Sequence, residues 1–277
     1  MLISQMVAPS AQLAPYIRHF WILQGDDAPA CTTTHDVYPD GCTTLLIMVA
    51  GELTLERHNG KALRRGIYAF HPSTTNNRNT LSGDIKMIDI QLNPGIFYAL
   101  FGLPVDAILD DTYEVHDLSI PFEPLFLDEL EQFFPHTTLL ASLINRWLHE
   151  LFHKHFRFDP FASLLTQLVT TSDLETFTRQ TGLCARQAER KCKTYNGISP
   201  KALSKIGRFY HVLSSMHTYV QNNTPYTQAL YESHYADQSH FIKEFKTFTG
   251  TTPKKFLTAP TQSLQFLPLF SSQEHTL

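Results

Sequence analysis

Basic and hydroxyl side chains recur at helical spacing in two stretches of the last third of the chain. Each stretch holds three of them at positions i, i+4 and i+7: Arg186, Arg190 and Lys193 in the first, and Ser239, Lys243 and Lys246 in the second. At about 100° per residue, each trio shares one face of a helix. Arginine and lysine bind phosphate oxygens or the edge of guanine, and serine contacts bases or phosphates. The chemistry open to these residues is the binding of a polyanion.

Apolar residues occupy the opposite face of each stretch at the same offsets: Ala188, Cys192 and Tyr195, and Phe241, Phe245 and Phe248. Such a stripe predicts a face that packs into a core. For a single helix, a basic face opposite a core stripe is also typical of an ordinary solvated surface. Because both faces recur in both stretches, the pattern favours two binding surfaces.

The two stretches end in the same nine-residue pattern, KTYNGISPK at 193–201 and KTFTGTTPK at 246–254. In each pattern a glycine stands where a left-handed residue ends a helix, and a proline follows. Upstream of the first, Ser172-Asp173-Leu174-Glu175 fits a capping box that begins a helix, and Gly182 lets the chain turn. The first copy therefore predicts two helices joined by a tight turn.

The second copy predicts the same order of elements. Thr224-Pro225 is typical of a helix start, a turn follows at His234-Tyr235-Ala236, and Asp237 is a good N-cap. Each copy is thus a helix-turn-helix. Residues 200–219 predict one connecting helix of about 30 Å, close to the turn of about 34 Å in B-DNA. Such a connector could set two helices into successive major grooves.

Charge is distributed unevenly along the 277 residues. Residues 161–260 hold 12 Lys and Arg against 6 Asp and Glu, whereas residues 1–160 hold 10 against 19, and the net charge of the chain is −4. The basic segment coincides with the two helix-turn-helix patterns. This asymmetry indicates that only the C-terminal part binds a polyanion.

The stretches GLCARQAERKCKTYNGISPKALSKIGRF and YADQSHFIKEFKTFTGTTPKKF resemble the AraC/XylS family of bacterial transcription regulators. The resemblance covers residues 160–260, and the order D-Q-S-H-F, E-F and T-G-x-T-P in the second stretch is similar to the family signature. It implies that the C-terminal domain binds double-stranded promoter DNA.

The resemblance also implies which side chains meet the DNA. Those facing bases would be Arg186, Glu189 and Arg190 in the first unit, and Gln238, Ser239 and Lys243 in the second. Helical spacing alone picks four of these six, and only Glu189 and Gln238 come from the resemblance. The candidates for phosphate contacts are lysines: Lys193, Lys246 and Lys254.

Five residues depart from the family pattern: Cys184, Ala188, Cys192, Ser233 and His234. Cys184 stands where a serine N-cap is usual, which could weaken that helix start by about 1 kcal/mol. Ala188 and Cys192 replace larger apolar residues, and His234 replaces a glycine in a turn. These changes keep open a second interpretation, in which DNA binding has decayed and the protein is a ligand-binding or partner-binding adaptor.

The first 120 residues predict a β-rich domain. Strand-like runs break at Gly51 and at Asn59-Gly60, which is a strong hairpin signal. Further turns are expected at Pro39-Asp40-Gly41, Ser82-Gly83 and Asn93-Pro94-Gly95. Short strands with turns between them favour a small barrel or sandwich.

This domain is similar to a sensor domain of some family members, through Tyr38-Pro39-Asp40-Gly41-Cys42 and through IDIQLNPGIFYALFGLP at 88–104. The resemblance implies that it senses a small-molecule effector, forms a homodimer, or does both. Trp21, Tyr38 and Phe70 fit an effector cavity or an ordinary core equally well.

The expected fold is a two-domain α+β chain. It comprises a β-rich barrel- or sandwich-like sensor domain at 1–120, a helical connector at 121–159, an all-α double helix-turn-helix domain at 160–260 and a tail at 261–277. The expected partners are promoter DNA, a small-molecule effector, a second copy of the chain and, if the protein activates transcription, RNA polymerase. No cofactor is expected.

Three features of the sequence bear on where in the cell the protein is found. No run of 18 apolar residues predicts a membrane span, and the first 20 residues lack the pattern of a signal peptide. The four cysteines, Cys31, Cys42, Cys184 and Cys192, show no CxxC spacing, so reduced thiols are expected. Together these observations favour a cytoplasmic protein.

One motif points to a different class of protein. His149-Glu150-Leu151-Phe152-His153 matches HExxH, which on a helix can place two histidines on Zn²⁺ with the glutamate as general base for hydrolysis. A related hypothesis is that these histidines, together with His155, bind a metal ion that the protein senses. The alternative is an amphipathic helix in a chain with 14 histidines. Because a zinc hydrolase needs a third ligand and the downstream chain forms helix-turn-helix units, the sequence favours a protein that is not an enzyme and holds no metal.

Overall fold

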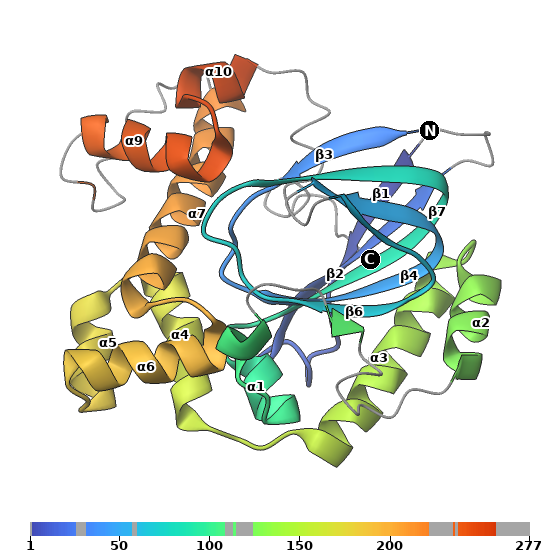
Figure 1. Ribbon diagram of the computed structural model, residues 1–277, viewed down its shortest axis with the longest axis horizontal. Coiled ribbons are helices and arrows are strands. Elements are labelled where there is room, and N and C mark those ends of the chain that lie inside the picture. Colours follow the sequence, from blue (N-terminus) through green and yellow to red (C-terminus); the bar gives the residue numbers. More distant parts are fainter. Residues whose placement is uncertain are drawn as a thin grey trace.

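A curled antiparallel sheet forms the N-terminal part of the molecule, and helices lie around its outside (Figure 1). The computed structural model describes residues 2–25, 32–56, 60–108, 113–114, 124–221, 235 and 238–258. The main strand order is β1-β2-β7-β4-β6-β8, with β3 beside β7 and β5 beside β4. The strands are β1 (Leu2–Val7), β2 (Ile17–Gly25), β3 (Thr33–Val37), β4 (Thr43–Leu55), β5 (Lys61–Leu63), β6 (Gly66–Phe70), β7 (Asn77–Leu92) and β8 (Tyr113–Glu114).

Except for β8, which comes after α1 and η2, the strands precede the helices along the chain. The helices are α1 (Ile96–Phe101), the 3-10 helix η2 (Val105–Ile108), α2 (Pro124–Phe133), α3 (Thr137–His155), α4 (Pro160–Thr171), α5 (Leu174–Thr181), α6 (Ala185–Asn196), α7 (Pro200–Gln221), α9 (Gln238–Thr249) and α10 (Pro253–Thr258). In Figure 1, α2 and α3 lie on one side of the sheet, and α4 to α10 lie on the other. The predicted fold class, a β-rich N-terminal domain and a helical C-terminal domain, is confirmed. No helix in the described ranges is long and apolar enough to cross a membrane.

Strand β7 presents alternate residues to two different environments. Ile88 and Ile90 join the core that the sheet forms with α3, whereas Met87 joins a second core inside the curled sheet. Successive side chains of a strand point to opposite faces. Asp89 and Gln91 therefore lie on the interior face together with Met87, and both line an interior cavity.

The sheet bends where two glycines face each other. Gly51 of β4 and Gly83 of β7 both have positive φ, and the register of β4 against β7 shifts on either side of Ala50. A Cβ on Gly51 would lie 2.8 Å from the carbonyl oxygen of Asp84, so only glycine fits there. The predicted turn at Ser82-Gly83 is wrong, because β7 runs through these residues as one bent strand.

The predicted hairpin is confirmed in its strands. β4 pairs with β5 in antiparallel register, Leu55 opposite Lys61, and the amide of Gly60 donates to the carbonyl of Leu55 over 3.1 Å. Gly60 has φ +72°. Asn59 lies outside the described residues.

Glycines end the helices of the first helix-turn-helix unit. Gly182 ends α5 and Gly197 ends α6, each in the left-handed conformation, as the sequence predicts. The N-cap of α5 is Asp173, whose side chain accepts from the amide of Thr176 over 2.9 Å. The predicted start of the capping box at Ser172 is wrong, because Ser172 instead ends α4 with φ +58°.

A buried asparagine side chain joins the helical part to the sheet domain by two hydrogen bonds. Asn196, at the end of α6, donates to the carbonyl of Gly41 over 3.1 Å and accepts from the amide of Gly95 over 3.3 Å. The ring of Tyr195 stacks on Tyr98 of α1 at 4.1 Å between centroids. These contacts fix α6 against the sheet domain.

Candidate functional site

Helix α6 carries the first basic face. Its predicted stripe of Ala188, Cys192 and Tyr195 is buried in the helical core. The helix begins after Cys184, and Gln187 accepts from the amide of Cys184 over 3.2 Å. Gln187 thus satisfies one of the amides at a helix start that lacks the usual serine.

The four residues that sequence reasoning assigned to the DNA-facing side of α6 are exposed: Arg186, Glu189, Arg190 and Lys193. Lys193 pairs with Glu189 at 2.8 Å. The hydrogen bond and charge of Lys193 lower the pKa of Glu189, and those of Glu189 raise the pKa of Lys193. Because this pair cancels its own charge, the positive charge of the face comes from Arg186 and Arg190.

Helix α9 carries the second basic face. Its predicted stripe of Phe241, Phe245 and Phe248 is buried. The residues that were assigned to the DNA-facing side are exposed: Gln238, Ser239, Lys243 and Lys246 on α9, and Lys254 on α10. The first helix and turn of this unit, including Thr224, Pro225, Ser233, His234, Ala236 and Asp237, lie outside the described residues.

A buried carboxylate holds α9 on α7. Glu244 of α9 contacts Lys205 at 2.9 Å and Arg208 at 3.3 Å, both on α7, and His240 at 3.3 Å. Burial opposes ionisation of Glu244, but the hydrogen bond from Lys205 and the charges of Arg208 and Lys205 lower its pKa overall. The orientation of the second basic face is therefore tied to α7.

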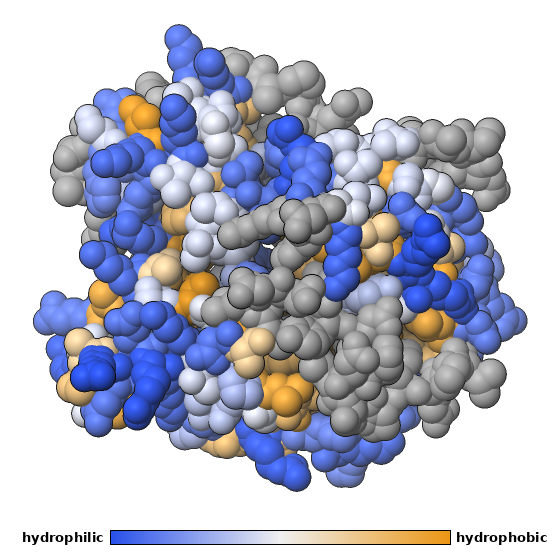
Figure 2. All heavy atoms as spheres, in the orientation of Figure 1, coloured by the Kyte–Doolittle hydropathy of each residue, from blue (hydrophilic) through white to orange (hydrophobic). Residues whose placement is uncertain are grey.

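The predicted connecting helix is confirmed as α7, which has 22 residues. At 1.5 Å per residue it is about 33 Å long. Figure 1 shows α6 near its beginning and α9 beside its far half. Figure 2 shows mainly hydrophilic side chains over α5, α6 and α9. The two basic faces thus lie at separate positions along one helix.

The sheet domain contains a cavity of about 120 Å³. Aromatic and apolar side chains line it, among them Trp21, Tyr38, Phe70 and Leu46, together with Tyr210 of α7. The sequence leaves open whether Trp21, Tyr38 and Phe70 are core or cavity residues; all three line the cavity and also pack in the hydrophobic cores around it. Tyr210 was missed, because its partner loop lies about 170 residues earlier in the chain.

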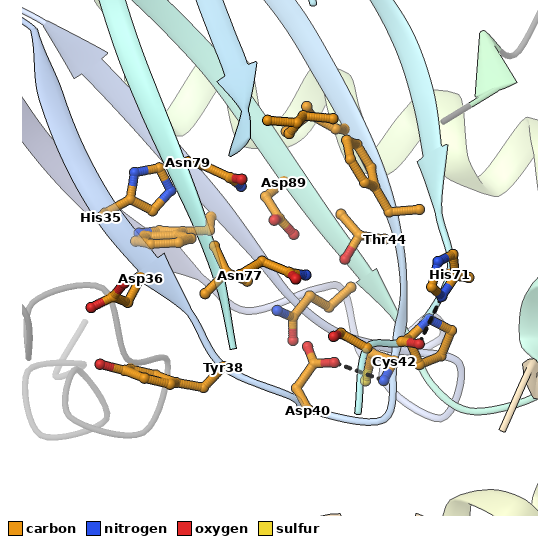
Figure 3. A pocket seen from close by; sticks show the side chains of 18 of the residues that line it. His35, Asp36, Tyr38, Asp40, Cys42, Thr44, His71, Asn77, Asn79 and Asp89 are labelled. Carbon is orange, nitrogen blue, oxygen red and sulfur yellow. Dashed lines mark hydrogen bonds between the residues drawn. The ribbon is translucent and has the colours of Figure 1, made fainter. Parts of the chain in front are cut away.

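The polar part of the cavity is acidic. Its lining includes Asp36, Asp40 and Asp89, and no lysine or arginine is found among the described lining residues. Asp36 pairs with Arg78 at 3.0 Å, and Asp40 accepts from the amide of Cys42 over 2.9 Å. Figure 3 shows Asp40 and Asp89 directed toward the same interior space.

Burial shapes the charge state of these groups. Burial and the charge of Asp40 raise the pKa of Asp89 to about 8. Burial also raises the pKa of Asp40, against the opposing charge of Arg18. The pKa of His35 is lowered by burial to about 4, so this imidazole is neutral at pH 7. Sequence reasoning missed Asp40 and Asp89, and the one signal was a polar residue at every second position of the stretch IDIQL.

The HExxH motif has a structural use. His149 of α3 lies 2.9 Å from the hydroxyl of Ser10 through its Nε2 atom. Leu151 and Phe152 are buried in the core between α3 and the sheet, and Glu150 and His153 are exposed. Within the described ranges, no group of three or more His, Cys, Asp or Glu is placed to hold a metal ion.

Comparisons with known proteins match both halves of the chain. A family model described as a helix-turn-helix domain matches residues 177–259, and a domain of unknown function, DUF6597, matches residues 5–114. A comparison with curated proteins finds no match.

Solved structures that align include ToxT from Vibrio cholerae, with 14% identity and a TM-score of 0.43 over 83% of this chain and 98% of that chain. ToxT bound to an unsaturated fatty acid aligns with 13% identity and a TM-score of 0.41, over 84% and 96% of the two chains. The AraC-like transcriptional activator CuxR aligns with 8% identity and a TM-score of 0.26, over 83% and 99%.

The helix-turn-helix match and the basic helices define the class: this is a transcription regulator with a helix-turn-helix domain. The D-Q-S-H-F motif at 237–241 and the T-G-x-T-P motif at 249–253 resemble the signature of the AraC/XylS family.

Proposed function

We propose that the protein controls transcription by setting α6 and α9 into successive major grooves of promoter DNA. The observation that carries this proposal is the pair of exposed basic faces joined by α7, a helix about 33 Å long. One turn of B-DNA is about 34 Å. A duplex lying along the two faces would meet one helix per turn.

The roles of the side chains follow from their chemistry. Arg186 and Arg190 of α6 and Lys243 of α9 would read guanine edges, while Gln238 would read adenine. Ser239 would contact a base or a phosphate, and Glu189 could accept from cytosine. The lysines Lys193, Lys246 and Lys254 would neutralise phosphates. When the protein binds DNA, Lys193 would leave its ion pair with Glu189 and contact a phosphate instead.

Genomic DNA supplies the first test. Fragments captured by the purified protein at about 150 mM salt are sequenced, and the best fragment is titrated with salt, because phosphate contacts alone can mimic affinity. We expect enriched fragments to share two short half-sites about one helical turn apart. No enrichment, with or without effector candidates, would favour the adaptor interpretation instead.

Single substitutions test the assigned faces. Arg190→Ala and Lys243→Ala should each weaken binding to the best fragment by about 1–3 kcal/mol if the side chain reads a base. The matched control is Arg64→Ala, which removes the same charge from an exposed, ion-paired site on the sheet domain. Unchanged binding of both variants to specific and random DNA would show that the reading faces are assigned wrongly.

The sheet domain would supply the regulation. An interior cavity that reaches α7 gives a small molecule a route to the DNA-binding helices. A fatty acid, the ligand of one ToxT structure, would bring its carboxylate to the acidic lining here. A second copy of the chain would be the further regulatory partner, and RNA polymerase the target of an activator. Sedimentation velocity with and without DNA tests self-association.

A further inference from the structure

We propose that the interior cavity is the binding site for a small organic cation, an amine of about ten non-hydrogen atoms, held by Asp89 and Asp40 and closed by Tyr210. The ligand class rests on the cavity alone. The regulatory consequence, that occupancy shifts the DNA-binding helices, rests on the proposed function.

Two buried oxygen atoms in the cavity lack hydrogen-bond partners in the described part of the chain, and they indicate that the ligand donates hydrogen bonds. The Oδ1 atom of Asp89 and the Oε1 atom of Gln91 are buried without a hydrogen-bond partner among the described residues. The two residues lie two positions apart on β7, and both line the cavity. Buried polar atoms are normally satisfied, so a pair of orphaned acceptors indicates a ligand that donates hydrogen bonds.

Charge selects a cation among such donors. Asp36 and Asp40 already have protein partners, whereas Asp89 faces the interior opposite Asp40 (Figure 3). Arg78 offsets Asp36 and Arg18 lies beside Asp40, but neither arginine lines the cavity, so an anion there would meet carboxyl groups first. An ammonium group would satisfy Asp89 and Gln91 together and compensate the charge of Asp40.

The remaining surface of the cavity suits an apolar body. Trp21 and Leu46 flank Asp89 directly, on β2 and β4, in the register of the sheet. An aromatic face beside a carboxylate adds cation–π attraction to an ammonium group. At about 12 Å³ for each water-sized sphere, the cavity holds roughly ten such spheres. This size matches a simple arylalkylamine or a diamine.

Tyr210 joins the site to the DNA-binding part. It lies on α7 two residues after Arg208, which contacts Glu244 of α9. Its pKa is raised by burial and by the charge of Asp40. Two turns earlier, Leu203 packs against the loop of Asp40: a Cβ on Gly41 would lie 2.8 Å from Leu203. A ligand at Asp40 therefore bears on α7 at two points.

Calorimetry on the full chain without DNA tests the ligand class. The probes at pH 8 are the amines tyramine, phenethylamine and agmatine, the neutral 4-ethylphenol, and the anion 3-(4-hydroxyphenyl)propanoate. We expect at least one amine to bind roughly tenfold or more tighter than the neutral and anionic probes. Equal or tighter binding of the anion or the phenol overturns the proposal, and so does the absence of binding by all three amines.

Two variants assign the binding to the carboxylates. Asp89→Asn should weaken the bound amine roughly tenfold or more and leave 4-ethylphenol unchanged. The control is Asp84→Asn, on the same strand and partly exposed beside Lys86. Asp40→Asn gives a second reading if Asp89→Asn folds poorly. Full amine affinity in both carboxylate variants would refute the assignment.

The pH dependence of amine affinity distinguishes direct binding by Asp89 from a purely structural role of this residue. Besides Asp89, the ionisable groups of the lining are His35, Asp36, Tyr38, Asp40, Cys42, His71 and Tyr210, and Arg18 of β2 lies beside Asp40. Because a cation must displace the proton of Asp89, amine affinity should rise about tenfold per pH unit between pH 6 and 8. The rise should persist in His71→Gln and vanish in Asp89→Asn. A flat profile in the wild type overturns the role of Asp89.

Coupling is measured separately, as the change in affinity for the best DNA fragment when the amine is added. We expect a change of about fivefold or more in the wild type. Leu203→Ala removes the contact of α7 with the Asp40 loop outside the cavity lining, so it should bind the amine within about threefold and lose most of this change. If the protein binds no DNA, the proposed function fails while calorimetry still decides the ligand. If DNA binding is intact and the amine has no effect on it, only the coupling fails.

Discussion

Replacing Gly207 by alanine tests the packing on which the whole helical part depends. Gly207 lies in the middle of α7, where this helix crosses α4. A Cβ there would lie 2.1 Å from the carbonyl oxygen of Val169 and 2.8 Å from the hydroxyl of Ser172. Intrinsic helix propensity favours alanine over glycine by about 1 kcal/mol, so propensity and packing predict opposite signs.

The magnitude follows from the closest contact. A Cβ normally stays more than 3.0 Å from such an atom, so α7 must move by roughly 1 Å, and a backbone carbonyl cannot rotate away. Overpacking of this kind costs about 1–3 kcal/mol, and sometimes more. Leu203, Ile206 and Phe209 of α7 share one buried core with residues of α4, and the packing of this core would loosen as α7 moves. Because the blocked atom is a backbone carbonyl, we expect a cost at the upper end of this range, about 3 kcal/mol, and a net loss of about 2 kcal/mol after the gain in propensity.

Thermal unfolding followed by circular dichroism measures this loss. For a chain of this size, about 2 kcal/mol corresponds to a fall in Tm of roughly 4–8 °C. Lys201→Ala is the control, because it introduces the same residue at an exposed position of the same helix and should change Tm little. If Gly207→Ala melts at or above the wild-type temperature, the close crossing of α7 over α4 is not as described.

Three further predictions concern buried groups. Asn196→Ala should lower stability by about 1–3 kcal/mol, because it leaves two backbone groups of the sheet domain without their partner; urea unfolding measures this, and a loss under about 0.5 kcal/mol would contradict it. Asp89 has a folded pKa of about 8, above its unfolded value, so its contribution to stability is lost as pH rises from about 4 to 8. Asp89→Asn should therefore gain stability over the wild type at pH 8 relative to pH 5, and an equal difference at both would refute this. Cys184 is exposed whereas Cys42 and Cys192 are buried with raised pKa values, so iodoacetamide mapped by mass spectrometry should label Cys184 before Cys42 and Cys192.

The helical faces were predictable because each depends on neighbours in sequence. Phe241 and Phe245 lie one turn apart, so their shared face follows from helix geometry alone. Gly197 ends α6 for an equally local reason, since a left-handed residue costs glycine little. The same reasoning gave the bounds of α9 from its sequence.

The cavity was not predictable because its walls meet across long sequence distances. The alternation of β7 shows that Asp89 and Ile88 face opposite ways, but only the packing of α3 decides which side is interior. Gly83 looked like a turn because its partner, Gly51, lies 32 residues earlier. Because the two glycines lie opposite each other on paired strands, β4 and β7 bend there and the chain does not turn back.

One helix, α7, contacts the cavity, the sheet domain and the helix of the second basic face. Tyr210 meets the cavity, Leu203 meets the Asp40 loop, and Arg208 holds Glu244 of α9. Substitutions that adapt the cavity to another molecule will therefore also alter the resting position of the DNA-binding helices. Ligand preference and basal promoter occupancy should change together in evolution or engineering, and separating them will require paired substitutions on both sides of α7.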